Sequence, residues 1–184
     1  MKLYKFKSVT DYTWSILEDS ELYFPTPLEF NDPYDCHVKL INTQHPHLDC
    51  NDNFKTINNL KSVIQILSLT ENVTSKFMWT FYGDEFKGIC FEFENHEDFI
   101  QSPDGYYSKG VIYGTKVPEI DMAKLTRGDV DDLAQANFYK SKDYEREEEY
   151  RFITCHGDKG GQLVKFNPKC LKRLILGPFC NQEE

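Results

Sequence analysis

Residues 144–153 have the sequence Tyr-Glu-Arg-Glu-Glu-Glu-Tyr-Arg-Phe-Ile, in which a run of charges passes directly into aromatic and β-branched residues. An alternation with a period of two is typical of a β-strand, and aromatic and β-branched side chains favour strands. From Glu147 onward, this alternation places carboxylates and an arginine on one face and aromatic rings on the other. Because an unpaired carboxylate is costly to bury, the stretch predicts a strand with Tyr150 and Phe152 buried and Glu149 partly exposed.

Glu147 and Glu149 are two residues apart on the predicted strand, close enough for their carboxylates to repel each other. If Arg151 or a lysine keeps one carboxylate ionised, the other is free to act as a general base or to stabilise a developing cation. The alternative is a strand at the edge of a sheet that faces solvent and carries Arg–Glu ion pairs, which are common structural features. The stretch alone leaves both interpretations open.

The composition predicts a single domain over residues 1–184 with an aromatic core, because 40% of the residues are hydrophobic and 15% are aromatic. The formal net charge of −9 argues against a protein held on nucleic acid by bulk electrostatics. No apolar run approaches about 18 residues, and residues 1–4 lack the apolar core of a signal peptide. We therefore expect a cytoplasmic protein without membrane association.

The six cysteines form no Cys-x-x-Cys pair, and without a secretory signal we expect them to be reduced thiols. Zinc binds the residue types found in one short segment, which contains Cys36, His37, His45, His47 and Cys50. A structural zinc site usually has tighter paired spacing than these residues show. The segment therefore favours a polar loop with scattered imidazoles over a metal site.

The hydrophobic pattern predicts short strands, which lie at residues 2–7, 22–24, 88–93, 110–113, 162–166 and 171–176. Helical spacing predicts helices at residues 11–18, 57–67 and 120–136, while residues 66–70 also fit a strand. Residues 38–58 are polar and resemble a loop. Because strands are often adjacent and short helices lie between them, the order indicates an α+β fold with a mixed, mostly antiparallel sheet.

Five short motifs, in order over nearly the whole chain, resemble blocks of a widespread bacterial domain family known mainly as a domain of unknown function. They are Leu-Tyr-Lys-Phe at 3–6, Phe-Asn-Asp-Pro-Tyr-Asp at 30–35, Met-Trp-x-x-Tyr at 78–82, Glu-x-Glu-Tyr-Arg at 147–151 and Leu-Ile-Leu-Gly-Pro at 174–178. The chain departs from this family at Phe81, where relatives commonly have a histidine, and at Tyr144, where they commonly have a tryptophan. With phenylalanine at position 81, that ring has no polar group to offer.

The order of the motifs also resembles the ADP-ribosyltransferase superfamily. Its members hold NAD with a residue on the first strand, a hydroxyl-bearing residue on a middle strand and a glutamate on a late strand. The corresponding residues in this sequence are Lys5, Ser68 or Thr70, and Glu149. Lys5 replaces the histidine or arginine that is usual on the first strand, and Glu147 with Glu149 is similar to the Glu-x-Glu pair of some of these enzymes. The resemblance implies a fold similar to that of ADP-ribosyltransferases, with NAD as the substrate.

Cleavage of NAD at the nicotinamide–ribose bond develops positive charge on the sugar, which a fixed carboxylate stabilises. We therefore assign catalysis to Glu149 and Glu147. Nucleotide binding is assigned to side chains that offer a charge, a hydroxyl or an aromatic ring: Lys5, Ser68, Thr70, Tyr82 and Arg151. One cleft is expected to be lined by Glu149, Arg151, Lys5 and Ser68. Trp79 is expected in the core because its ring buries a large area.

Two classes of function remain open. The first is an enzyme that cleaves NAD and transfers ADP-ribose to a macromolecular acceptor of unknown type, in a setting such as bacterial defence or phage conflict. The second is a non-catalytic module that binds a nucleotide or a partner protein in the same cleft. A requirement for Glu149 in NAD turnover separates the two.

Overall fold

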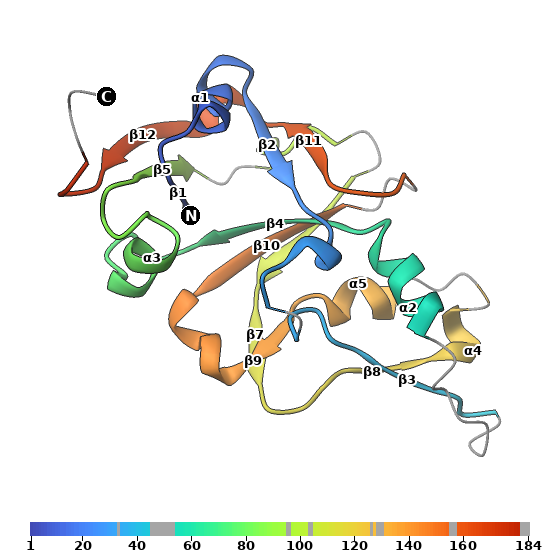
Figure 1. Cartoon of the computed structure of the whole chain (residues 1–184). Coiled ribbons are helices and arrows are strands. Elements are labelled where there is room, and N and C mark those ends of the chain that lie inside the picture. Colours follow the sequence, from blue (N-terminus) through green and yellow to red (C-terminus); the bar gives the residue numbers. More distant parts are fainter. Residues whose placement is uncertain are drawn as a thin grey trace.

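The computed structural model describes residues 1–32, 34–44, 54–94, 97–102, 105–125, 127, 131–154 and 158–180. Its centre is a six-stranded sheet in which every pairing is antiparallel and the strand order is β12-β5-β1-β4-β10-β6 (Figure 1). In chain order, the strands of this sheet are β1 (Lys2–Lys7), β4 (Gln65–Thr70), β5 (Ile89–Glu94), β6 (Tyr107–Gly110), β10 (Glu149–Thr154) and β12 (Leu171–Leu176).

Three two-stranded pairs surround this sheet in the described part of the chain. One pair is antiparallel and consists of β2 (Glu21–Phe24) and β11 (Gln162–Lys165). The other two are parallel: β3 (Lys39–Ile41) pairs with β8 (Glu119–Asp121), and β7 (Ile112–Gly114) pairs with β9 (Tyr139–Ser141). The predicted α+β fold with a mixed, mostly antiparallel sheet is confirmed.

The helices are short and lie around the sheet (Figure 1). The α-helices are α1 (Asp11–Glu18), α2 (Phe54–Lys61), α3 (Lys76–Phe81), α4 (Met122–Leu125) and α5 (Asp131–Ala136). The 3-10 helices that the structure describes include η1 (Pro27–Glu29), η3 (Lys142–Glu147) and η4 (Pro168–Cys170). The predicted helix at residues 11–18 is confirmed with the same bounds.

Three predicted elements differ from the structure. The helix predicted at residues 57–67 ends at Lys61, and β4 begins at Gln65, so the strand interpretation of residues 66–70 is correct. The helix predicted at residues 120–136 begins instead as β8, because Ile120 pairs with β3 and packs in an apolar cluster, and α4 and α5 follow. The strand predicted at residues 110–113 is divided at Val111 between β6 and β7.

The prediction of a loop at residues 38–58 is wrong in two places, because the segment contains β3 and the first turn of α2. Both elements contribute apolar side chains to a core cluster, although most residues of the segment are polar. Residues 45–53 of that segment lie outside the described residues.

The six-stranded sheet is divided into two halves. β1 pairs with β5 through six residues, and β4 pairs with β10 through six residues. Between these halves, β1 and β4 share one residue pair, Tyr4 with Thr70. Beyond that pair the two strands diverge, and the chain after β2 enters the gap, where the N–H of Ile66 donates to the carbonyl of Pro25. The divergence leaves strand-edge main chain facing the interior of the fold.

The core consists of apolar clusters on both sides of the sheet. The largest is rich in phenylalanine, and some of its rings meet edge-on, as Phe99 does with Phe152 at 5.2 Å between ring centroids. A smaller cluster joins β1 to α3 through Phe6 and Trp79. Trp79 is buried and its ring nitrogen donates to the carbonyl of Val73, so the prediction that it belongs to the core is confirmed.

Gly88 is required where β5 begins, because a Cβ at this residue would lie 2.3 Å from the carbonyl oxygen of Lys7. We expect Gly88→Ala to lower the free energy of unfolding by about 1–3 kcal/mol, since backbone must move to relieve the contact. Gly110→Ala is the matched control, because a Cβ there meets nothing within 4 Å. Urea unfolding curves of the two variants test this, and equal midpoints would contradict the tight packing.

Candidate functional site

A cavity of about 720 Å³ lies where β1 and β4 diverge. Its walls come from β1, β4, α3, the segment that follows β2, and the turn before β10. Many of its side chains are aromatic: Tyr4, Phe6, Phe30, Phe77, Phe81, Tyr82 and Tyr144. Its charged side chains are five carboxylates and two lysines: Glu29, Asp32, Asp35, Glu147, Glu149, Lys5 and Lys140. The cavity therefore combines aromatic walls with an excess of acidic groups.

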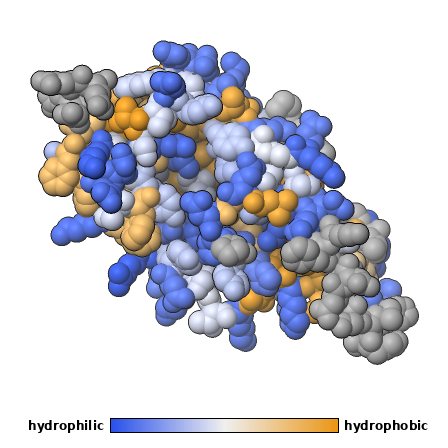
Figure 2. All heavy atoms as spheres, viewed as in Figure 1, coloured by the Kyte–Doolittle hydropathy of each residue, from blue (hydrophilic) through white to orange (hydrophobic). Residues whose placement is uncertain are grey.

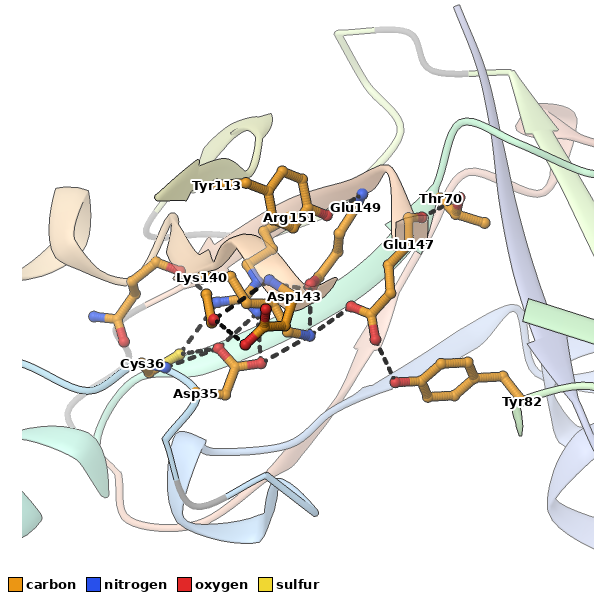
Figure 3. Close-up of polar contacts among 12 residues, drawn as sticks. Asp35, Cys36, Thr70, Tyr82, Tyr113, Lys140, Asp143, Glu147, Glu149 and Arg151 are labelled. Carbon is orange, nitrogen blue, oxygen red and sulfur yellow. Dashed lines mark hydrogen bonds and ion pairs between the residues drawn. The ribbon is translucent and has the colours of Figure 1, made fainter. Parts of the chain in front are cut away.

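A buried network of charges forms one side of the cavity, and Arg151 on β10 is its centre (Figure 3). Its guanidinium has no exposed surface. The Nε atom donates to Glu149, and the Nη2 atom donates to both oxygens of Asp35 at 2.8 Å and to Glu149 at 3.0 Å. The Nη1 atom donates to the carbonyl of Asn137 and to the sulfur of Cys36. Every N–H group of the guanidinium therefore has a partner, as a buried arginine requires.

Lys140 is the second cation of the network. From β9 its ammonium forms ion pairs with Glu147 at 2.5 Å, Asp35 at 3.1 Å and Glu149 at 3.2 Å. Burial alone would lower the pKa of Lys140, but the three carboxylates outweigh it and raise the pKa above its ordinary value. The ammonium thus remains charged and joins the three carboxylates.

The sequence between Lys140 and Arg151 positions both glutamates against this ammonium. Glu147 ends η3, Glu148 adopts a left-handed conformation with φ of 46°, and Glu149 begins β10. The left-handed residue separates η3 from β10, and Glu147 and Glu149 both reach Lys140 although only Glu149 belongs to the strand.

Glu149 is buried at 6% exposure, so the prediction that it is partly exposed is wrong. The cost of burying the carboxylate is offset by Arg151 and Lys140. Burial would raise the pKa of Glu149, but these two cations, with hydrogen bonds from Arg151 and Ser68, lower the pKa to about 2. The carboxylate is therefore ionised at any physiological pH.

Glu147 differs from Glu149 in its remaining capacity to accept hydrogen bonds. Glu149 accepts two bonds from Arg151, one from Lys140 and one from Ser68, which occupy about the four positions a carboxylate offers. Among the described residues, Glu147 accepts one from Tyr82 at 2.8 Å and one from Lys140. It therefore retains acceptor positions toward the cavity.

Tyr82 and Thr70 fix Glu147 from two sides. Burial and the neighbouring Glu147 carboxylate raise the pKa of Tyr82, so its hydroxyl stays protonated and donates to that carboxylate. The hydroxyl of Thr70 donates to the main-chain carbonyl of Glu147 at 2.6 Å. Thr70 is fully buried and does not line the cavity. It therefore positions Glu147 from behind the cavity wall.

Lys5 lies within β1 and contributes to the wall of the cavity. Its ammonium reaches across the gap and donates to the main-chain carbonyl of Ser68 at 2.8 Å. Burial and the nearby charge of Lys7 lower the pKa of Lys5 to about 7, against a smaller opposing effect of Glu149. Lys5 is therefore not an ordinary solvated strand residue.

The structure brings together most of the residues predicted for the site. Five of them line the cavity: Lys5, Ser68, Tyr82, Glu147 and Glu149. The single cleft was predicted for Lys5, Ser68, Glu149 and Arg151, and it is correct only in part, because Arg151 lies behind Glu149 and is not part of the cavity wall. The edge-strand alternative is also wrong, because β10 lies between β4 and β6. Phe152 is buried as predicted, whereas Tyr150 is only partly buried.

Sequence reasoning missed Asp35 and Lys140. Asp35 lies in a turn in which its N–H donates to the carbonyl of Asp32. It also ends the motif at residues 30–35 that supports the family resemblance, so a charged residue inside that motif was the available signal. Lys140 lies shortly before the Glu-x-Glu-Tyr-Arg motif, outside the five motifs that carry the resemblance.

The described residues contain no group of three or more histidine, cysteine, aspartate or glutamate side chains that could hold a metal ion. Cys36 is buried, and burial raises the pKa of its thiol to about 12. Of the other residues considered for zinc, His37 is exposed, and those at positions 45, 47 and 50 lie outside the described residues. Of the helices that the structure describes, none has the length and apolar character needed to span a bilayer.

Residues 78–152 match the model of a family described as a protein of unknown function, DUF2971. The match extends from α3 into β10 and includes Tyr82, Lys140, Glu147, Glu149 and Arg151. Comparisons with curated proteins and with solved structures give no match. The matched part of the chain is therefore similar to a domain of unknown function, and the comparison assigns it no activity.

The depressed pKa of Glu149 predicts an acid-sensitive stability. Its pKa is about 2 in the folded protein and 4.5 ordinarily, so the unfolded state binds the proton more readily. The stabilisation is complete above pH 4.5 and is lost as the pH falls toward 2, and it amounts to about 3 kcal/mol. In urea unfolding over this pH range, we expect Glu149→Gln to be less stable at pH 7 and to lose less stability in acid. The same acid dependence in both proteins would contradict the assignment.

Proposed function

We propose that the cavity binds NAD and that the protein cleaves its nicotinamide–ribose bond, transferring ADP-ribose to water or to an acceptor. The proposal depends chiefly on the meeting of Lys5, Ser68 and Glu149, from three different strands, at one aromatic-lined cavity. The volume of about 720 Å³ falls within the range of about 300–1,000 Å³ that is typical of small-molecule sites.

The charges of the cavity favour one orientation of NAD. The nicotinamide ring of NAD carries a positive charge, whereas the pyrophosphate is negative. Carboxylates outnumber lysines among the lining residues, and aromatic rings attract a planar cation. The nicotinamide end is therefore directed toward Glu147 and Glu149, and the pyrophosphate toward the cavity mouth and solvent.

The division of the sheet supplies a way to recognise the nicotinamide. Its carboxamide has one donor group and one acceptor group, as a peptide unit does. Past the Tyr4–Thr70 pair, the main-chain groups of β1 and β4 are not joined to each other by the ladder, and of the β4 groups the N–H of Ile66 and the carbonyl of Ser68 are already bonded to other partners. Strand-edge N–H and C=O groups of this kind pair readily with an amide.

The two glutamates have different roles in this proposal. When the bond between C1′ and the ring nitrogen breaks, its electron pair passes to nicotinamide, which leaves neutral, and positive charge develops on the ribose. Glu149 supplies a negative charge that is fixed in place before the reaction. Glu147 accepts a hydrogen bond from a ribose hydroxyl. Water or an acceptor then bonds to C1′ and releases its proton to solvent.

A non-catalytic nucleotide-binding or protein-binding module is the second candidate, and one observation favours it. The acceptor positions of Glu149 are filled by Arg151, Lys140 and Ser68, which is the arrangement of a structural ion pair. On the face shown in Figure 2, apolar side chains form small, separate patches in a mainly hydrophilic surface. A module of this kind would therefore use the cavity rather than an apolar patch on this face.

Nicotinamide release separates the two candidates. We expect the wild-type protein to bind NAD and to release nicotinamide, and Glu149→Gln to reduce turnover on the order of a hundredfold or more, with little change in the Kd for NAD. Glu147→Gln should reduce turnover less, because glutamine still accepts a hydrogen bond. Glu145→Gln is the matched control, since Glu145 is exposed on the same turn and does not line the cavity.

Calorimetry measures NAD binding, chromatography measures nicotinamide, and circular dichroism verifies that each variant is folded. A Kd for NAD weaker than about 1 mM in the wild-type protein contradicts the proposal. Tight NAD binding without nicotinamide release, with a cell lysate as the source of acceptors, supports the non-catalytic module.

A further inference from the structure

Lys5 occupies an unusual position for a lysine. It is partly buried in the cavity wall, and its ammonium donates to the carbonyl of Ser68. Five carboxylates line the same cavity, yet within the described residues none of them forms an ion pair with Lys5. Glu147 and Glu149 instead form ion pairs with Lys140, and Glu149 also forms one with Arg151. The amine of Lys5 is therefore enclosed with room for a ligand beside it.

The surroundings of Lys5 favour its neutral form. Burial and the charge of Lys7, on the same strand, lower the pKa of Lys5 to about 7, and Glu149 from β10 opposes this weakly. Among the described residues, the other charged or titratable groups on the cavity wall are Tyr4, Glu29, Asp32, Asp35, Tyr82, Lys140, Tyr144 and Glu147. A substantial fraction of Lys5 is then a free amine near neutral pH, which is the nucleophilic form.

We propose that Lys5 is a reactive amine that forms an imine with an aldehyde bound in the cavity. The nitrogen lone pair attacks the carbonyl carbon to give a carbinolamine. The carbon–oxygen bond then breaks, the oxygen leaves as water with protons taken from the amine, and a C=N bond to Lys5 remains. No oxidant or reductant is needed for this step.

The cavity also restricts the class of aldehyde. Its aromatic walls suit a planar ligand, and its excess of carboxylates disfavours an anionic one. The ligand class is therefore a neutral or cationic planar aldehyde. This inference depends on the position of Lys5 and on access to the cavity, and it holds whether or not the protein cleaves NAD.

Reductive trapping tests the inference. The full chain is incubated with 4-(trimethylammonio)benzaldehyde and cyanoborohydride, which reduces an imine to a stable secondary amine, and labelled peptides are mapped by mass spectrometry. We expect the label on Lys5 ahead of other lysines, with half-maximal labelling near pH 7. The anionic probe 4-formylbenzoate carries the opposite charge on the same benzaldehyde framework, and it should label Lys5 at about one tenth of the rate of the cationic probe, or at a lower rate.

Two variants sharpen the test. Lys5→Met, which keeps the length of the side chain, should lose the fast label, and thermal unfolding verifies that it is folded. Lys7→Met should keep the label on Lys5 but move its pH midpoint upward, because a neighbouring positive charge is removed. A label spread over surface lysines, a wild-type midpoint near the ordinary lysine value of 10.5, or equal rates with both probes would overturn the inference.

Discussion

The buried guanidinium of Arg151 is the constraint on which the rest of the site depends. A charge with no exposed surface must be paired, and each of its N–H groups must be bonded, or the folded state loses several kcal/mol. Arg151 meets this requirement by binding Asp35 from the segment after β2, the carbonyl of Asn137 after α5, and Glu149 on its own strand. The segment after β2 and the chain after α5, which are far apart in the sequence, are thereby held against β10.

Lys140 extends this constraint into the cavity. By pairing with Asp35, Glu147 and Glu149, it holds three carboxylates within reach of a ligand. The division between β1 and β4 then provides the space, since the sheet is joined there by a single residue pair. The three carboxylates held by Lys140 and the gap in the sheet together determine which ligand fits the cavity. They favour a planar and preferably cationic group.

Local pattern predicted much of the fold. The strands at residues 2–7 and 171–176 and the helix at residues 11–18 agree with the structure because their alternation or helical spacing is expressed within a few residues. The helix predicted at residues 120–136 was wrong at its beginning, because Ile120 is committed to a pairing with Leu40 that only the tertiary fold supplies.

The site could be predicted only in part, for the same reason. The charges and hydroxyls of Lys5, Ser68 and Glu149 were visible in the sequence, but the burial of Glu149 depends on partners elsewhere. Arg151 binds Asp35 across 116 positions of sequence, and no local pattern contains that contact. The left-handed residue Glu148, which ends η3 before β10 begins, was likewise hidden by an apparently regular alternation.

A double-mutant cycle between Asp35 and Arg151 tests most directly whether this network is one cooperative unit. The free energy of unfolding in urea is measured for the wild type, Asp35→Asn, Arg151→Met and the double variant. The account predicts that the double variant is less destabilised than the sum of the single variants by about 1–3 kcal/mol, because each change removes the same interaction. Effects that add within about 0.5 kcal/mol would contradict it.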